Sequence, residues 1–255
     1  MSDYLSNFEN KQLPSHLTDA ISSDIDKRQK WFDSYSLPSF DIERLKKNMV
    51  KINSADNSAY GNVYKASDGD REVVLKFAKG GKDLVRIGLG GVENAMREEY
   101  LGLLIAHTIS PDIFPEPYGV IRSKKGKIVG FAMEYVAESA RLADFWEDSK
   151  DNPGDLIFNP RHRPGKELSI SFFQKLKSGV DAVVDAGLIL TDLHKWNILV
   201  DKNMNPKILD VSYYVDPQIA YGSRIAEYLP PKEYFREGIH QSIDYWITLL
   251  KKNET

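Results

Sequence analysis

The chain has 255 residues, a formal net charge of −3 and no cysteine. The lack of cysteine excludes disulfide bonds, thiolate metal sites and cysteine nucleophiles, and it favours a cytosolic working environment. Charges of both signs are interspersed and no apolar run is long enough to span a membrane, so the composition argues against nucleic acid, an anionic membrane surface and a membrane span.

Residues 1–48 are predicted to form an N-terminal extension that is partly disordered and carries short helices. Its first 20 residues are polar and show little periodicity, and they lack the basic and then apolar pattern of a cleaved signal peptide. Apolar spacing predicts a helix over 23–35 and a second, short one over 41–48.

Residues 49–135 are predicted to be rich in strands, with a single helix. Period-two alternation between turn residues indicates the strands, and a stripe of large apolar residues indicates the helix. A glycine-punctuated insert at 80–91 precedes that helix. The predicted elements are strands over 50–52, 62–65, 73–77, 118–121 and 128–133 and a helix over 93–107.

Residues 136–255 are predicted to be mainly helical. After a Pro- and Asn-rich loop, the clearest helical pattern of the chain is followed by Gly187, a residue typical of helix ends. Short apolar runs indicate strands near the middle of this part. The predicted elements are helices over 167–186 and 231–251 and strands over 188–190, 198–200 and 208–209.

The spacing of three polar residues among these short strands predicts a chemical site. Asn197 lies five residues after Asp192, and Asp210 lies thirteen residues after Asn197. Phosphoryl transfer needs a carboxylate beside the attacking hydroxyl and oxygen ligands that hold Mg²⁺ on the phosphates. We therefore predict Asp192 as the catalytic base and Asn197 and Asp210 as metal ligands; polar groups on the surface are the alternative.

Lys76 ends the apolar strand Val-Val-Leu-Lys, where a fixed cation suits phosphate oxygens. Most lysines at strand ends face solvent, which is the alternative reading. A helix with two adjacent glutamates follows, and one of them, Glu98 or Glu99, is expected to pair with Lys76. Glu99 is narrowly preferred because Leu103, one turn further on, is expected to pack inward.

These motifs resemble those of the protein kinase-like superfamily over about residues 50–215. The resemblance implies an α+β, two-lobed protein kinase-like fold: a β-rich N-lobe (49–135) with one αC-like helix and a shortened, mainly helical C-lobe (136–255). It also implies nucleotide binding, with ATP and Mg²⁺ as cofactors and Mn²⁺ as an alternative metal. The catalytic set that it implies is Asp192, Lys76, Asn197 and Asp210.

The resemblance extends to the nucleotide site. Residues 56–63 align with the phosphate loop of the family, although of its three glycines only Gly61 is kept. The stretch Met-Glu-Tyr-Val at 133–136 resembles the kinase hinge, which implies that adenine bonds to backbone groups of Glu134 and Val136. The nucleotide-binding residues implied in this way are Gly61, Val63, Val74, Lys76, Glu98, Glu99, Met133, Glu134, Val136 and Leu199.

Departures from the family pattern indicate which kind of kinase the chain resembles. Thr191 stands where regulated kinases carry arginine, which implies activity without phosphorylation of an activation loop. Val211-Ser212 replaces Phe-Gly, and 45 residues follow Asp210. The chain is thus similar to minimal bacterial Ser/Thr protein kinases, notably secreted type III effector kinases. That similarity implies a protein substrate, such as a host protein, a role in virulence, and a cytoplasmic location or secretion into a host cytosol without a cleaved signal peptide.

Two other functions stay open. Small-molecule kinases of the aminoglycoside or choline phosphotransferase type share the pattern Asp-Leu-His-x-x-Asn, but they add helical substrate-binding structure after the metal-binding aspartate. A pseudokinase-like binding module is suggested by the divergent glycine loop. Retention of Lys76, Asp192, Asn197 and Asp210 argues against it, because a binding module needs no such set.

Overall fold

The chain has an α+β fold with antiparallel sheets and several helices. The computed structural model describes residues 15–21, 25–43, 45, 48–52, 61–78, 91–145, 168–188, 190, 193, 195–211 and 232–253. In this part of the chain, no helix is both long and apolar enough to cross a membrane. The elements are α1 (Ser15–Thr18), η2 (Asp19–Ile21), α2 (Ile25–Ser34), β1 (Val50–Lys51), β2 (Gly61–Asp68), β3 (Arg71–Ala78), α4 (Val92–Ile109), β4 (Pro117–Arg122), β5 (Ile128–Glu134), β6 (Ala140–Arg141), η4 (Leu142–Phe145), α5 (Ile170–Asp185), β7 (Ile198–Val200), β8 (Pro206–Ile208) and α8 (Lys232–Asn253).

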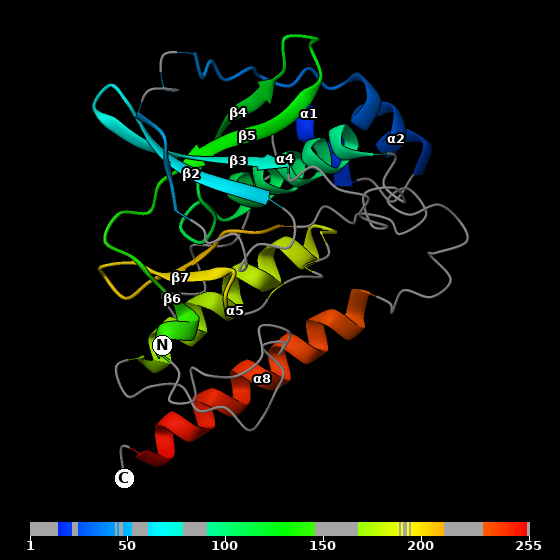
Figure 1. The fold of residues 1–255 in the computed structure, drawn as a ribbon. Coiled ribbons are helices and arrows are strands. Elements are labelled where there is room, and N and C mark those ends of the chain that lie inside the picture. Colours follow the sequence, from blue (N-terminus) through cyan, green and yellow to red (C-terminus); the bar gives the residue numbers. More distant parts are fainter. Residues whose placement is uncertain are drawn as a thin grey trace.

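The larger sheet has five antiparallel strands in the order β1-β2-β3-β5-β4, and α4 packs against one of its faces (Figure 1). The central strand β3 places Lys76 opposite Val63 of β2 and Phe131 of β5. Gly130 is required beside it, because a Cβ at that position would lie 2.4 Å from the carbonyl oxygen of Lys76. The backbones of β3 and β5 are therefore in close contact at Lys76.

The smaller sheet, in the order β6-β7-β8, lies between the larger sheet and the helices α5 and α8 (Figure 1). Its β7–β8 hairpin pairs Ile198 with Ile208. Ser169 caps the N-terminus of helix α5, where its hydroxyl accepts a hydrogen bond from the amide of Phe172 at 3.2 Å. Ion pairs such as Lys177–Asp244, at 2.7 Å, join α5 to α8. Strand β8 of the hairpin packs on α5, and α5 in turn packs on α8.

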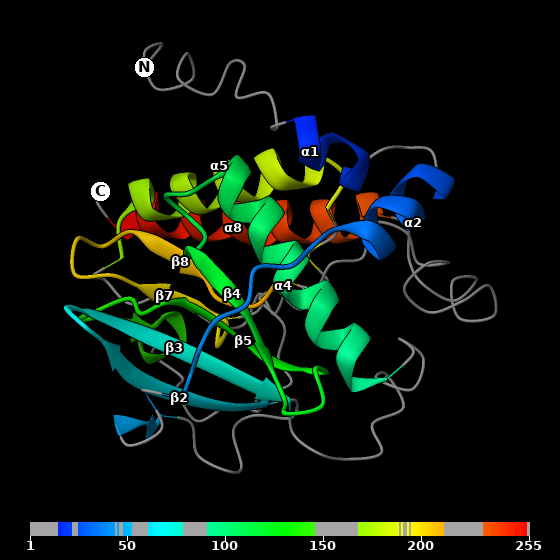
Figure 2. The same cartoon turned by 90° about the horizontal axis from the view of Figure 1, so that it is seen from above.

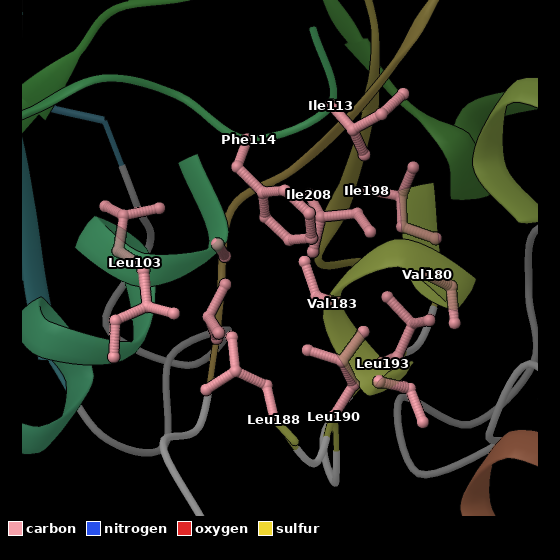
Figure 3. Packing of buried hydrophobic residues seen from close by; sticks show 14 of the residues in the cluster. Leu103, Ile113, Phe114, Val180, Val183, Leu188, Leu190, Leu193, Ile198 and Ile208 are labelled. Atoms are coloured by element: carbon pink, nitrogen blue, oxygen red, sulfur yellow. The ribbon is translucent and has the colours of Figure 1, made fainter. Parts of the chain in front are cut away.

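A continuous apolar core connects the two sheets. Figure 3 shows Leu103 of α4 and Phe114 of the following turn facing Val183 of α5 and Ile208 of β8. The same buried cluster extends to Trp246 of α8. The helix behind the larger sheet and the hairpin of the smaller sheet are therefore held by shared packing, which fixes the relative positions of any side chains that they carry.

The strand and helix predictions hold for most of the described residues, with three corrections. Residues 15–21, expected to be loosely ordered up to residue 20, are helical, because Leu17 and Ala20 are buried in the core. Of the helix predicted over 41–48, the described residues 41–43 and 45 lie in no helix, whereas Asn48 lies in a 3₁₀ turn and its amide bonds to the carbonyl of Leu45. Leu188 lies in no strand either, because its amide bonds to the carbonyl of Val183 and caps α5. Strand β6 was not predicted.

Candidate functional site

Three predicted residues from distant parts of the chain meet at one point. The ammonium of Lys76, on β3, donates hydrogen bonds to Glu99 of α4 and to Asp210, two residues after β8. The Lys76 Nζ to Asp210 Oδ2 distance is 3.0 Å, across a sequence separation of 134 residues. Lys76 is only 9% exposed. Its reading as a strand-end lysine in solvent is therefore wrong, and a buried cation lies between two carboxylates.

The choice between the adjacent glutamates follows from helix geometry. Successive residues of a helix are about 100° apart, so only one of the pair can face β3. Glu99 is that residue, and it makes the ion pair with Lys76. Glu98 is buried elsewhere on α4, at 6% exposed. Of the two nucleotide-site glutamates predicted, Glu98 therefore makes no ion pair with Lys76 in the structure.

Mutual attraction keeps the lysine charged. Burial lowers the pKa of Lys76, but the carboxylates of Asp210 and Glu99 outweigh burial, and the net pKa is raised. Burial raises the pKa of Glu99, and the nearby negative charge of Asp210 acts in the same direction against the attraction of Lys76. Two carboxylates thus share one ammonium.

Asn197 and Asp210 are brought together at the open end of the β7–β8 hairpin. The amide of Leu209 donates to the carbonyl oxygen of Asn197 at 2.8 Å, which places the residue before Asp210 beside Asn197. The side chain of Asp210 is 24% exposed, so a ligand can reach it. Amide and carboxylate oxygens are donors that Mg²⁺ accepts, and this donor set fits an ion that also binds phosphate and water.

The described part of the chain holds no group of three or more His, Cys, Asp or Glu side chains arranged for a metal. A metal held only by the protein is therefore not indicated among these residues. A Mg²⁺ ion shared with a bound nucleotide needs fewer protein ligands, because it typically keeps several waters and binds one or two carboxylates plus phosphates.

The hairpin that carries Asp210 is fastened to the segment after α4. The amide of Ile208 donates to the carbonyl of Ile113 at 2.8 Å. Lys207 Nζ donates to the carbonyl of Pro111 at 3.1 Å and lies 4.0 Å from the carboxylate of Glu134. Sequence reasoning did not single out Lys207, since a lone lysine on a short strand gives no signal of this role. Through this ion pair, Lys207 of β8 contacts the last residue of β5.

The predicted hinge at 133–136 is only partly available to a ligand. Met133 is buried in β5, and the amide of Glu134 donates to the carbonyl of Glu116 at 2.8 Å, so this donor is already used. The Val136 carbonyl accepts from the Ser139 hydroxyl. Among the residues that the structure describes, none accepts from the amide of Val136. The predicted contact of adenine with the amide of Glu134 is therefore ruled out, whereas a contact with the amide of Val136 stays a prediction.

The other predicted residues divide into two groups. Val63, Val74 and Leu199 lie on β2, β3 and β7, and Gly61 begins β2. Asp192 lies outside the described residues, as do positions 56–60 of the predicted phosphate loop. The structure therefore brings together Lys76, Glu99 and Asp210, with Asn197 next to Asp210, while the position of the predicted base stays a prediction.

Glu98 leads to a prediction about stability. Burial raises the pKa of its carboxyl group to about 8 from an ordinary value of 4.5. Between about pH 5 and pH 8 the folded chain keeps a proton that the unfolded chain loses, so the free energy of unfolding falls as pH rises, by roughly 2–4 kcal/mol. Glu98→Gln should remove this part of the pH dependence in urea unfolding at several pH values. Glu237→Gln, at an exposed position of α8, is the control; equal slopes in Glu98→Gln and wild type would contradict the prediction.

The chain was also compared with known proteins. No model of a protein family matches it, and no curated protein matches it in sequence. A function therefore has to be argued from the residues themselves, beginning with the buried contact of Lys76, Glu99 and Asp210.

Proposed function

We propose that this chain is an ATP- and magnesium-dependent phosphotransferase, and specifically a Ser/Thr protein kinase with a two-lobed protein kinase-like fold. The observation that carries the proposal is the burial of Lys76 between Glu99 and Asp210. Burying one cation with two carboxylates is costly in desolvation, and such clusters are concentrated at functional sites. Three residues expected for one reaction, contributed by three separate elements, support a phosphate site better than a stabilising ion pair.

The proposed roles follow from charge and position. Lys76 would bind phosphate oxygens of ATP, and Glu99 would hold its ammonium in place. Asn197 and Asp210 would hold Mg²⁺ against the same phosphates, where the ion supplies neutralisation of charge. Asp210 contacts Lys76 directly. Nucleotide binding would thus exchange this carboxylate–ammonium contact for contacts with phosphate and metal, at little change in the charge around either group.

The transfer step needs one base. The hydroxyl oxygen of a Ser or Thr acceptor attacks the γ-phosphorus, the bond from that phosphorus to the bridging oxygen of ADP breaks, and ADP leaves with the electron pair. The proton of the hydroxyl passes to the carboxylate of Asp192. This role of Asp192 rests on its spacing from Asn197. Because Thr191 replaces the usual arginine, the proposal includes activity without activation-loop phosphorylation and, by the same resemblance, an effector acting on host proteins.

The test is phosphate transfer by the purified full chain. It is incubated with γ-labelled ATP and Mg²⁺, alone, with a generic basic protein, and with a host-cell lysate. We expect label on Ser or Thr that requires Mg²⁺ and that survives Lys177→Met, a change to the lysine of α5 that pairs with Asp244 of α8. Mg²⁺-dependent ATP binding without any labelled protein would instead point to a small-molecule acceptor or a binding module.

A further inference from the structure

The segment from residue 25 to residue 40 crosses the back of the helix that carries Glu99. It consists of α2 and the extended residues after it, and we refer to it as the brace. Figure 2 shows it in blue, passing from α2 across α4 towards β4. Its Trp31, Phe32 and Leu37 are buried in the same apolar cluster as α4. The brace is thus part of the folded core.

The C-terminal end of α2, in the middle of the brace, is bound to α4 by Arg97. The guanidinium Nη2 of Arg97 donates to the carbonyl of Phe32 and, at 2.9 Å, to that of Tyr35. Its central carbon lies 5.1 Å from the centre of the Phe32 ring. Carbonyls at the C-terminal end of a helix lack partners within the helix and carry partial negative charge, so a cation there satisfies both needs.

The C-terminal end of the brace is bound to the edge strand of the larger sheet. The amide of Val120, on β4, donates to the carbonyl of Pro38, and the amide of Phe40 donates to the carbonyl of Val120, both at 2.8 Å. Gly119 is required at this crossing, because its φ is +149° and a Cβ there would lie 2.9 Å from the Pro38 oxygen. The brace therefore spans from α4 to the sheet on which α4 rests.

Arg97 and Glu99 point in opposite directions from α4. Two residues along a helix correspond to a rotation of about 200°. Arg97 faces the brace, and Glu99 faces Lys76 on β3. Helix α4 is thus held between the brace on one side and the sheet on the other. Contacts on both sides of α4 thus bear on the position of Glu99.

We propose that the brace sets the position of α4, and that Arg97 is a positioning residue that keeps Glu99 paired with Lys76. The inference rests on the proposed function, for which the Lys76–Glu99 pair orients the phosphate-binding cation. The N-terminal segment then serves phosphate transfer from a distance, without touching ATP or acceptor. A displacement of α4 by about 1 Å is sufficient to cost up to 100-fold in rate.

The test uses Arg97→Met in the full chain, with Arg97→Lys as the conservative variant. Methionine keeps an apolar stem but loses the two hydrogen bonds, whereas lysine keeps a cation at the end of α2. We expect Arg97→Met to lower kcat by about 10- to 100-fold with little change in the KM for the acceptor, and Arg97→Lys to restore part of it. Arg71→Met, which removes an arginine paired with Asp68 in the β2–β3 turn, should leave kcat unchanged.

A double-variant comparison separates positioning from general loss of stability. In a Glu99→Gln background, Arg97→Met should cause no further loss of kcat, because the pair that it positions is already broken. A full additional loss in that background would overturn the proposal. So would a kcat of Arg97→Met equal to that of Arg71→Met.

Hydrogen exchange keeps the inference distinguishable from the proposed function. Arg97→Met should speed exchange of the amides of α4, and Arg71→Met should not. If the wild-type chain transfers no phosphate, the proposed function fails. Hydrogen exchange alone then tests whether the brace sets the position of α4. Faster exchange across α4 in Arg97→Met supports the proposal that the brace positions α4, and protection equal to that of the wild type overturns this proposal.

Discussion

Replacing Lys76 by methionine is expected to lower the rate of phosphate transfer by at least about 10²–10³-fold, the typical loss for one preorganised electrostatic contact. Methionine fills similar space but leaves the phosphates without their cation. It also leaves the partly buried carboxylates of Glu99 and Asp210 without their shared ammonium. Removing one partner from such a cluster typically costs about 3–5 kcal/mol. Initial rates with labelled ATP and urea unfolding at neutral pH measure the two effects.

Two controls separate charge from geometry at this position. Lys76→Arg keeps the positive charge and should retain most of the stability, but its wider guanidinium should still reduce transfer. Lys177→Met removes an ion pair on α5 and should change neither quantity by more than a small factor. A transfer rate close to wild type in Lys76→Met would show that the lysine does not bind the phosphates, whatever the free energy of unfolding of this variant.

Asp210→Asn is the second change with a large expected effect. The amide has the shape of the carboxylate but no charge, so it should bind Mg²⁺ and the charge of Lys76 much more weakly. Lewis-acid stabilisation by a metal is worth several kcal/mol, and the transfer rate should therefore fall by more than about 10²-fold. In calorimetric titrations, ATP should then bind with little dependence on Mg²⁺. The fold should persist, because Glu99 still pairs with Lys76.

A matched control lies in the same hairpin. Asp201, in the turn between β7 and β8, accepts hydrogen bonds from the amides of Asn203 and Asn205 at 2.8 Å. Asp201→Asn removes a negative charge just after β7, as Asp210→Asn removes one just after β8. It should lower the stability of the chain but leave the Mg²⁺ dependence of ATP binding intact. Unchanged Mg²⁺-dependent ATP binding in Asp210→Asn would refute the assignment of Asp210 as a metal ligand.

Local patterns predicted the long elements well. The helix expected over 167–186 corresponds to α5, and the one expected over 93–107 to α4, because each has a wide apolar stripe that must be buried. Short elements were harder. The two-residue strand β6 has no periodicity of its own. Leu188 looks like part of a strand in the sequence, but its amide is needed to cap α5. Such residues depend on tertiary contacts that local pattern does not contain.

The same holds for the candidate site: local sequence predicted its residues, but not the contacts between distant parts of the chain. Spacing along the chain singled out Asn197 and Asp210, and the apolar strand that it ends singled out Lys76. The expected inward packing of Leu103 narrowly favoured Glu99 over its neighbour. No local pattern predicts that Lys76 contacts Asp210 directly, because that contact depends on how the two sheets are placed. Nor does the sequence reveal that the amide of Glu134 is already bonded to Glu116, a contact between β5 and the residue before β4.

The contact between Lys76 and Asp210 also determines when the site can be completed during synthesis of the chain. It closes a loop of 134 residues, and the entropy lost in closing so long a loop is recovered only when both ends are packed. On a ribosome, the larger sheet and α4 emerge long before residue 210 has been synthesised. A nascent chain at that stage carries the cation and its glutamate without the second carboxylate. The site is therefore completed only after synthesis has passed the β7–β8 hairpin.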